Sequence, residues 1–354
     1  MAKMELWSNT KNVPLRDRGS VFTDEMTLDF EDACATAAQA GLRFVDVRKL
    51  WNGFSHDVPR EHWAEMARLL AAHQLQLGAI QSNFGKCDIS GPEYDSHMAF
   101  FPTLVEQAHY FGTNVIRVFP FWNDVKITYD PALPGGIRPN LEEMLPEIVH
   151  RFKPAADLAR KEGVFLGFEP EHSTFSGSPQ EVARIMDAID NPHVGVAWDV
   201  NNGWDDLSIQ EAYTLFKGRI FNVHVKERTL TPDEHRAVRP MLGSLGAGVP
   251  ATPESAAVER TSGSSTVIGA AAPPPDAQSR LRRQPTLLGT GALPWAWIID
   301  RLERDGYRGL YSIETHFGVR GTYGWPKLKA GTTYFAYALR ELLEGAESRL
   351  SAAT

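Results

Sequence analysis

The stretch Val164-Phe165-Leu166-Gly167-Phe168-Glu169-Pro170 has the composition of a buried strand that ends in a carboxylate. Its first five residues carry no polar side chain, which is typical of a strand covered on both faces of a parallel sheet. Seven further short runs of strand-forming residues occur along the chain. The eight predicted strands are residues 5–8, 44–48, 77–81, 115–119, 164–168, 194–198, 220–224 and 310–313.

Helix-length segments with start and stop signals separate these runs. Ser178-Pro179-Gln180-Glu181 is a capping box with proline at the first helical position, and Gly41 is a suitable helix stop after residues 30–40. Eight alternations of strand and helix predict an α/β fold, a single-domain (β/α)8 TIM barrel. A doubly wound open sheet is the alternative, but no strand is followed by the glycine fingerprint G-x-G-x-x-G.

Residues 243–285 interrupt this alternation. They are dominated by Gly, Ala, Pro, Ser and Thr and include Pro273-Pro274-Pro275, so they offer too little apolar surface to offset the entropy of ordering. We expect one TIM-barrel catalytic domain over residues 1–354 with a mobile insertion at 243–285, after the seventh strand. Two interpretations of the insertion stay open, a disordered spacer and a lid or partner-docking loop.

The composition is that of a soluble globular protein. The 354 residues include 43% hydrophobic and 23% charged side chains, with 36 Lys and Arg against 44 Asp and Glu. The net charge of -8 and the lack of a basic block disfavour a nucleic-acid partner. No apolar run is long enough to span a membrane, and the N-terminus lacks a signal-peptide pattern. Two cysteines are too few for a disulfide scaffold, so we expect a cytoplasmic enzyme.

Four predicted strands end in residues that can bind metal: Glu169, Asp199, His224 and Glu314. In a TIM barrel the carboxyl ends of the strands line the active site. A carboxylate buried behind an apolar strand is costly unless it is paired or bound to a cation. Three oxygen ligands and one nitrogen suit Mn²⁺, Mg²⁺ or Co²⁺, with Zn²⁺ as a further option. The alternative is four unrelated residues that make salt bridges at the barrel rim.

Other polar residues at strand ends are candidates for substrate binding. Arg48, Gln81 and Arg117 end or follow the second, third and fourth strands, although arginine there could equally form a rim salt bridge. Lys226 lies two residues after His224 and could bind a substrate oxygen or neutralise Glu227. By the same spacing, Glu171 shares a face with Glu169, and His316 shares one with Glu314.

The strand endings F-E-P, W-D-V-N-N, N-V-H-V-K-E and S-I-E-T-H resemble those of the xylose-isomerase-like superfamily of sugar-phosphate isomerases and epimerases. The run Leu288-Gly289-Thr290-Gly291 and the later Gly306-Tyr307-Arg308-Gly309 resemble the approach to the last metal-binding strand of that family. The resemblance covers nearly the whole chain outside the insertion. Its motifs are specific for the superfamily rather than for a substrate.

The resemblance implies that Glu169, Asp199, His224 and Glu314 bind one divalent ion, Mn²⁺ in the first place. As in the ketose 3-epimerase branch, Glu169 and Glu314 would also be the catalytic pair that removes a proton beside a carbonyl and returns it on the opposite face. Some relatives carry a histidine where this chain has Asn202. An amide can hydrogen-bond a sugar hydroxyl but does not titrate near neutral pH, so His172 and His316 become candidates for further acid/base work.

The sequence therefore predicts a metal-dependent sugar isomerase or epimerase that acts through an enediolate, with a small sugar or glycoside as substrate. In that case we expect a homo-oligomer. The alternative is the catalytic subunit of a C-glycoside deglycosylase, a lyase acting on 3-oxo-C-glycosides that resembles this chain in its metal site and works with a small β-rich partner subunit. The apurinic endonuclease branch is disfavoured by the few strand-end histidines and the acidic charge. A non-catalytic sugar-binding barrel is disfavoured because all four predicted ligands are present.

Overall fold

The computed structural model describes residues 5–51, 53–123, 140–202, 209–228, 286–291, 293–317 and 325–352. Eight parallel strands form one sheet in the order β1-β10-β9-β8-β7-β6-β5-β2. A parallel bridge between Phe22 and Asp46 joins β1 to β2 and closes the sheet into a barrel. The strands are β1 Gly19–Val21, β2 Phe44–Val47, β5 Gln76–Ile80, β6 Val115–Val118, β7 Phe165–Phe168, β8 Val194–Asp199, β9 Ile220–Val225 and β10 Tyr311–Ile313.

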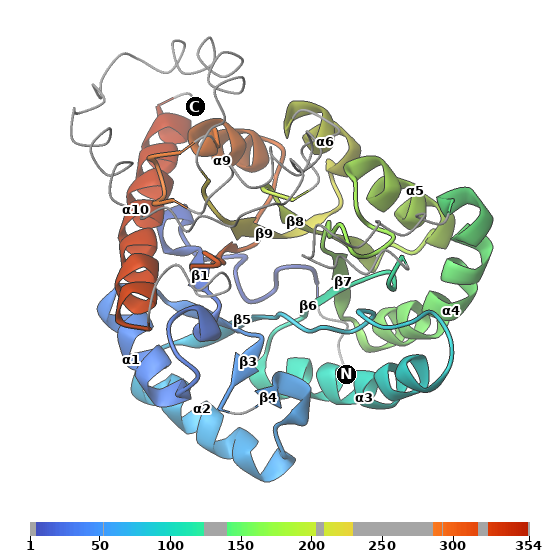
Figure 1. The fold of residues 1–354 in the computed structure, drawn as a ribbon. Helices are drawn as coiled ribbons and strands as arrows, with labels where there is room; N and C mark the ends of the chain where they lie inside the picture. The colour runs from blue at the N-terminus through green and yellow to red at the C-terminus, as the bar shows by residue number, and fades with distance from the viewer. Residues whose placement is uncertain are drawn as a thin grey trace, which may run out of the picture.

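The described helices form a ring outside the strands, as Figure 1 shows in a view along the barrel. They are α1 Phe30–Gln39, α2 Trp63–Ala72, α3 Pro92–Phe111, α4 Leu141–Glu162, α5 Pro179–Ile189, α6 Ile209–Phe216, α9 Trp295–Arg304 and α10 Trp325–Ser351. Strand and helix alternate along the chain, so the predicted (β/α)8 TIM barrel is confirmed. The predicted cap of α5 is also present, since Ser178 accepts a hydrogen bond from the Glu181 backbone N–H and Pro179 is the first helical residue.

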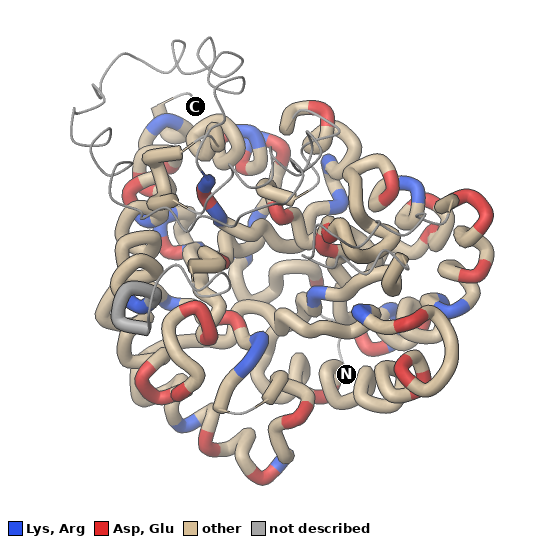
Figure 2. Tube along the Cα trace, in the orientation of Figure 1, with Lys and Arg blue, Asp and Glu red and all other residues tan. Residues whose placement is uncertain are grey.

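Short elements border the strand ends. β3 Lys49–Leu50 and β4 Gly53–Phe54 form a hairpin after β2, and the 3-10 turns are η1 Leu15–Asp17, η2 Thr23–Glu25, η3 Ser55–Asp57 and η4 Arg60–His62. None of the described helices combines the length and apolarity needed to cross a membrane. Along the described chain, Lys and Arg are interspersed with Asp and Glu on the outer helices (Figure 2).

The prediction of the first strand at residues 5–8 is wrong. These residues form a turn at the amino-terminal end of the barrel, where the Trp7 indole N–H donates to the Phe221 carbonyl at 2.8 Å. Leu6 packs on a small cluster that includes Val115 and Phe165, the first residues of β6 and β7. Leu6 and Trp7 are therefore partly buried because they cover the end of the barrel, and the first strand is Gly19–Val21 instead.

The predicted insertion at 243–285 lies outside the described residues and stays a prediction. β9 is the seventh barrel strand, and α9 is the next helix that the structure describes.

Candidate metal centre

Glu169, Asp199, His224 and Glu314 converge at the carboxyl ends of four neighbouring strands. Glu169 directly follows β7, Asp199 ends β8, His224 lies in β9 and Glu314 directly follows β10. Each offers one ligand atom, and these four atoms all lie within 4.8 Å of one another. All four side chains are buried. The sheet order places the four strands side by side, so the spacing follows directly from the barrel.

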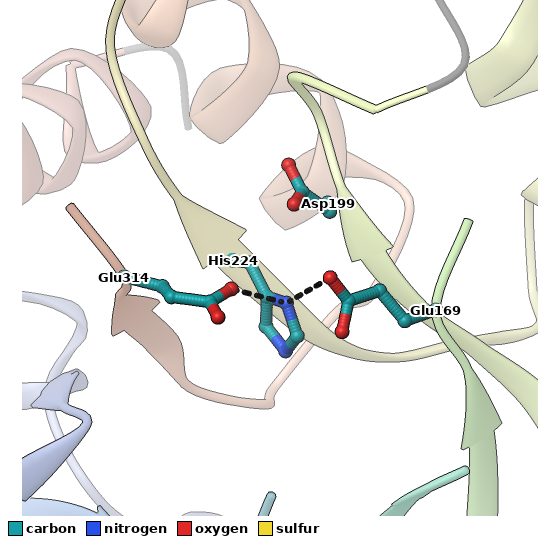
Figure 3. A group of neighbouring side chains, drawn as sticks. All are labelled: Glu169, Asp199, His224 and Glu314. Carbon is teal, nitrogen blue, oxygen red and sulfur yellow. Dashed lines mark ion pairs between the residues drawn. The ribbon is translucent and has the colours of Figure 1, made fainter. Parts of the chain in front are cut away.

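His224 lies between the two glutamates, which approach its ring from opposite sides (Figure 3). Its Nδ1 is 3.4 Å from Glu314 Oε2 and 3.9 Å from Glu169 Oε1. Within the part of the chain that the structure describes, neither ring nitrogen has a hydrogen-bond partner, although the side chain is fully buried. Burial lowers the pKa of His224 to about 4, so the imidazole is neutral at neutral pH. A neutral buried imidazole beside carboxylate oxygens fits a divalent ion, because a metal would use the unpaired nitrogen.

Two arginines hold the glutamates in place. Arg117 Nη1 is 2.7 Å from Glu169 Oε2 and 3.7 Å from Glu314 Oε1. Its other nitrogens donate to the carbonyls of Ser82 and Gln81 at 3.1 and 3.0 Å. Burial would raise the pKa of Glu169, but Arg117, with His224 and Lys226 adding to its effect, lowers the pKa below its ordinary value. The guanidinium of Arg117 is thus fully engaged within the protein.

Arg48 joins the last strand end to the first. It pairs with Glu314, with Glu25 at 2.9 Å and with Asp24 at 2.7 Å. Glu25, Glu314 and His316 also lie close enough together to hold a metal ion. The Arg48 guanidinium already pairs with both Glu25 and Glu314, so the charge of this second group is balanced by a cation of the protein itself.

Lys226 enters the cluster from β9, two residues beyond His224. Its ammonium pairs with Asp199, lies 3.0 Å from Glu314 Oε2 and lies 4.0 Å from Glu169 Oε1. Burial would lower the pKa of Lys226, but these carboxylates raise it, so the side chain is charged. Burial raises the pKa of Asp199 to about 6, with Lys226 opposing the shift and the neighbouring glutamates adding to it.

The connected ion pairs leave the centre with two uncompensated negative charges. Five carboxylates face three cations in this network, and its members are Asp24, Glu25, Glu169, Asp199, Glu314, Arg48, Arg117 and Lys226. The Asp, Glu, Lys and Arg side chains of this network thus carry a formal charge of -2, which one divalent cation would neutralise. The donor set and the charge therefore both fit the predicted metal ion.

Two more predicted residues reach the glutamates. The Asn202 side-chain amide donates to Glu169 Oε1 at 3.3 Å. His316 Nε2 is 3.0 Å from Glu314 Oε1, and 36% of the His316 side chain is exposed. His316 has a left-handed backbone with φ 56°, and its N–H donates to Glu25 Oε2 at 3.0 Å. This hydrogen bond holds a conformation that a non-glycine residue rarely adopts.

The remaining predicted residues lie away from the four-residue cluster. Gln81 donates to Asp46 Oδ2 at 2.8 Å and to Asn222 Oδ1 at 3.1 Å, in a polar network inside the barrel. Glu171 pairs with Lys86 at 3.0 Å; burial would raise its pKa, but Lys86 lowers it to about 2. The His172 carbonyl accepts from the Asn123 amide at 2.9 Å. Substrate binding by Gln81 and Glu171 and catalysis by His172 stay predictions.

The end of the first strand contributes residues that were not predicted from the sequence. Phe22 packs edge-on against the His224 ring at 5.1 Å, and Asp24 and Glu25 bind Arg48. The signal was present, because Val21-Phe22 followed by Asp24-Glu25 repeats the pattern of an apolar run that ends in carboxylates. It was overlooked because the first strand was assigned to residues 5–8.

These features define a class of protein: a TIM barrel with a buried acidic centre, able to hold a metal, at the carboxyl end of its strands. The chain belongs to the xylose isomerase-like TIM barrel family, whose model matches residues 34–330. A search of curated protein sequences finds no match.

Solved structures of low sequence identity share the fold. A xylose isomerase-like TIM barrel protein from Mycobacterium smegmatis, in complex with magnesium, is 16% identical with a TM-score of 0.62, covering 90% of this chain and 89% of that one. D-Psicose 3-epimerase from Clostridium cellulolyticum, with D-tagatose, is 12% identical with a TM-score of 0.55, covering 95% and 98%. A "probable 3-DHS dehydratase" of petrobactin synthesis from Bacillus anthracis is 15% identical with a TM-score of 0.57, covering 89% and 97%.

Proposed function

We propose that the protein is a divalent-metal-dependent enzyme that isomerises or epimerises a sugar by moving a proton beside a carbonyl group. The observation that carries this proposal is the buried convergence of three carboxylates on His224, whose two ring nitrogens have no hydrogen-bond partner among the described residues. Glu169, Asp199, His224 and Glu314 would hold the ion, with Mn²⁺ preferred over Mg²⁺, Co²⁺ and Zn²⁺. The magnesium-bound relative and the epimerase of the same fold support the proposal.

The positions of the two glutamates support separate roles for them. When bound, the ion would supply Lewis-acid polarisation of the substrate carbonyl. Glu169 and Glu314 flank the His224 ring from opposite sides, so a substrate held between them would present its two faces to two different carboxylates (Figure 3). One carboxylate removes the proton and the other returns it, as general base and general acid.

Neighbouring side chains keep Glu169 and Glu314 ionised and oriented for proton transfer. Arg117 keeps Glu169 ionised at neutral pH, and Asn202 orients its second oxygen. Burial would raise the pKa of Glu314, but Lys226, His316 and Arg48 hold it well below its usual range. His316 is partly exposed and contacts Glu314, so it can pass a proton between that carboxylate and solvent.

The experiment is proton exchange in D₂O, followed by NMR on a panel of free ketoses. Chelator-treated protein should be inactive, and Mn²⁺ should restore deuterium incorporation at the carbon beside the carbonyl. Glu169→Gln and Glu314→Gln should lose turnover, whereas Glu142→Gln, which breaks an exposed ion pair with Arg184 on the outer helices, should keep it. Full activity in chelator, or in both active-site variants, would refute the proposal.

The lyase alternative uses the same centre, and a dehydratase among the structures of this fold favours keeping it as a second candidate. The lyase is distinguished from the isomerase or epimerase by adding 3-oxo-C-glycosides to the substrate panel, with and without a small β-rich partner subunit. Release of an aglycone without epimerisation of any ketose would select the lyase.

A further inference from the structure

Lys226 occupies the position of a cation in the four-residue cluster. Its Nζ contacts oxygens of Asp199 and Glu314 and lies 4.0 Å from a third oxygen, Glu169 Oε1. These three carboxylates are the ones proposed to bind the metal ion. The Lys226 side chain is 3% exposed, so water cannot take over these contacts.

The contacts involve oxygens that also face the histidine. Glu314 Oε2 is 3.0 Å from Lys226 Nζ and 3.4 Å from His224 Nδ1. Glu169 Oε1 is 4.0 Å from Lys226 Nζ and 3.9 Å from His224 Nδ1. A divalent ion bonds to carboxylate oxygens at about 2.0–2.2 Å. An ion on these oxygens and His224 would therefore lie within a few ångströms of the ammonium, where two positive charges repel strongly.

We propose that Lys226 is a built-in counter-cation, which stabilises the metal-free centre and is displaced from the carboxylate oxygens when a divalent ion binds. The inference rests on the metal centre of the proposed function. It adds an account of what stabilises the carboxylates of that centre when no metal is bound. Buried carboxylates need a partner in either state, and the lysine provides it until the ion arrives.

Because Lys226 and the metal ion compete for the same carboxylates, removing the Lys226 charge should lower the stability of the metal-free protein and raise its affinity for the metal. Without the Lys226 charge, Asp199 of the metal-free protein loses the cation that pairs with it, and Glu169 and Glu314 keep the guanidinium groups of Arg117 and Arg48, so the fold loses stability. The metal ion, however, no longer has to displace an ammonium, so its affinity rises. A lysine that only helped to build the site would lower stability and metal affinity together.

The test uses chelator-treated full-length protein and Mn²⁺ titrated by calorimetry. Lys226→Met removes the charge, and Lys226→Gln removes it while keeping an amide that can donate to the carboxylates, in case the methionine variant does not fold. Lys86→Met is the matched control, because Lys86 pairs with Glu171 rather than with the cluster. We expect at least tenfold tighter Mn²⁺ binding in the Lys226 variants, equivalent to about 1.4 kcal/mol, and no change in the control.

Thermal unfolding supplies a second readout. The midpoint of the metal-free Lys226 variants should fall, and Mn²⁺ should raise it by more than in the wild type. Unchanged or weaker Mn²⁺ binding in the Lys226 variants would overturn this inference alone. Absence of Mn²⁺ binding in every protein would overturn it together with the metal centre. Tighter binding without proton exchange on any sugar would leave it standing and refute the proposed function.

Discussion

Arg117→Met tests whether the buried ion pairs support the acidic centre. Arg117 is 5% exposed and binds Glu169 at 2.7 Å, while its other nitrogens satisfy two backbone carbonyls. Removing one partner of a buried ion pair costs about 3–5 kcal/mol, because the other charge stays buried without compensation. The two carbonyls of Ser82 and Gln81 would also lose a donor. We therefore expect the free energy of unfolding in chelator to fall by at least ~3 kcal/mol.

The assay is urea unfolding of the chelator-treated protein, repeated with saturating Mn²⁺. Because the ion would neutralise Glu169, the gap between Arg117→Met and wild type should narrow when Mn²⁺ is present. Arg184→Met is the control, since its pair with Glu142 lies exposed on the outer helices. A loss in Arg117→Met as small as that in Arg184→Met, or a gap that Mn²⁺ leaves unchanged, would refute the reasoning.

Three further predictions concern other parts of the barrel. His224→Phe should abolish Mn²⁺ binding, measured by calorimetry. The folded pKa of His224 is about 4, below the ordinary 6.5, so its contribution to stability is present above pH 6.5 and is lost as pH falls through 4. Urea unfolding between pH 4 and 7 should therefore show ~3 kcal/mol less pH dependence in His224→Phe than in wild type. Trp7→Phe removes the hydrogen bond to Phe221 and should cost ~1 kcal/mol in urea unfolding; no loss would argue against its role in covering the barrel end. Glu25→Gln should destabilise the protein more than Asp24→Asn, because both pair with Arg48 but Glu25 also accepts from Thr315 and His316. Equal losses in these two variants would contradict that difference.

Some residues of the site could be predicted from the sequence because their place depends only on where each strand ends. Glu169 and Glu314 each follow an apolar run, and parallel strands of one barrel end at the same rim. Position in the strand therefore fixes position in space, and the four predicted ligands do converge. The side chain two residues further on shares the same face, which is why Lys226 and His316 also reach the cluster.

Other parts could not be read because they depend on contacts between distant segments. For Arg48 and Arg117 the sequence left substrate binding and a rim salt bridge open, and the structure shows their guanidinium groups bound to Glu314 and Glu169 of other strands. Glu25 holds Thr315 at a separation of 290 residues, and no periodic pattern reports such a pair. Leu6 and Trp7 have the composition of a strand, but partial burial against the end of the barrel accommodates their apolar side chains equally well.

The sequence by itself determined the barrel and the four residues of its acidic centre. Both follow from periodicity and from the common direction of parallel strands, which are local properties repeated along the chain. Only the tertiary structure decided which strand comes first, which charges pair and which buried nitrogens have no hydrogen-bond partner among the described residues. Those outcomes depend on distances of a few ångströms between side chains from different strands, and such distances exist only once the barrel has closed.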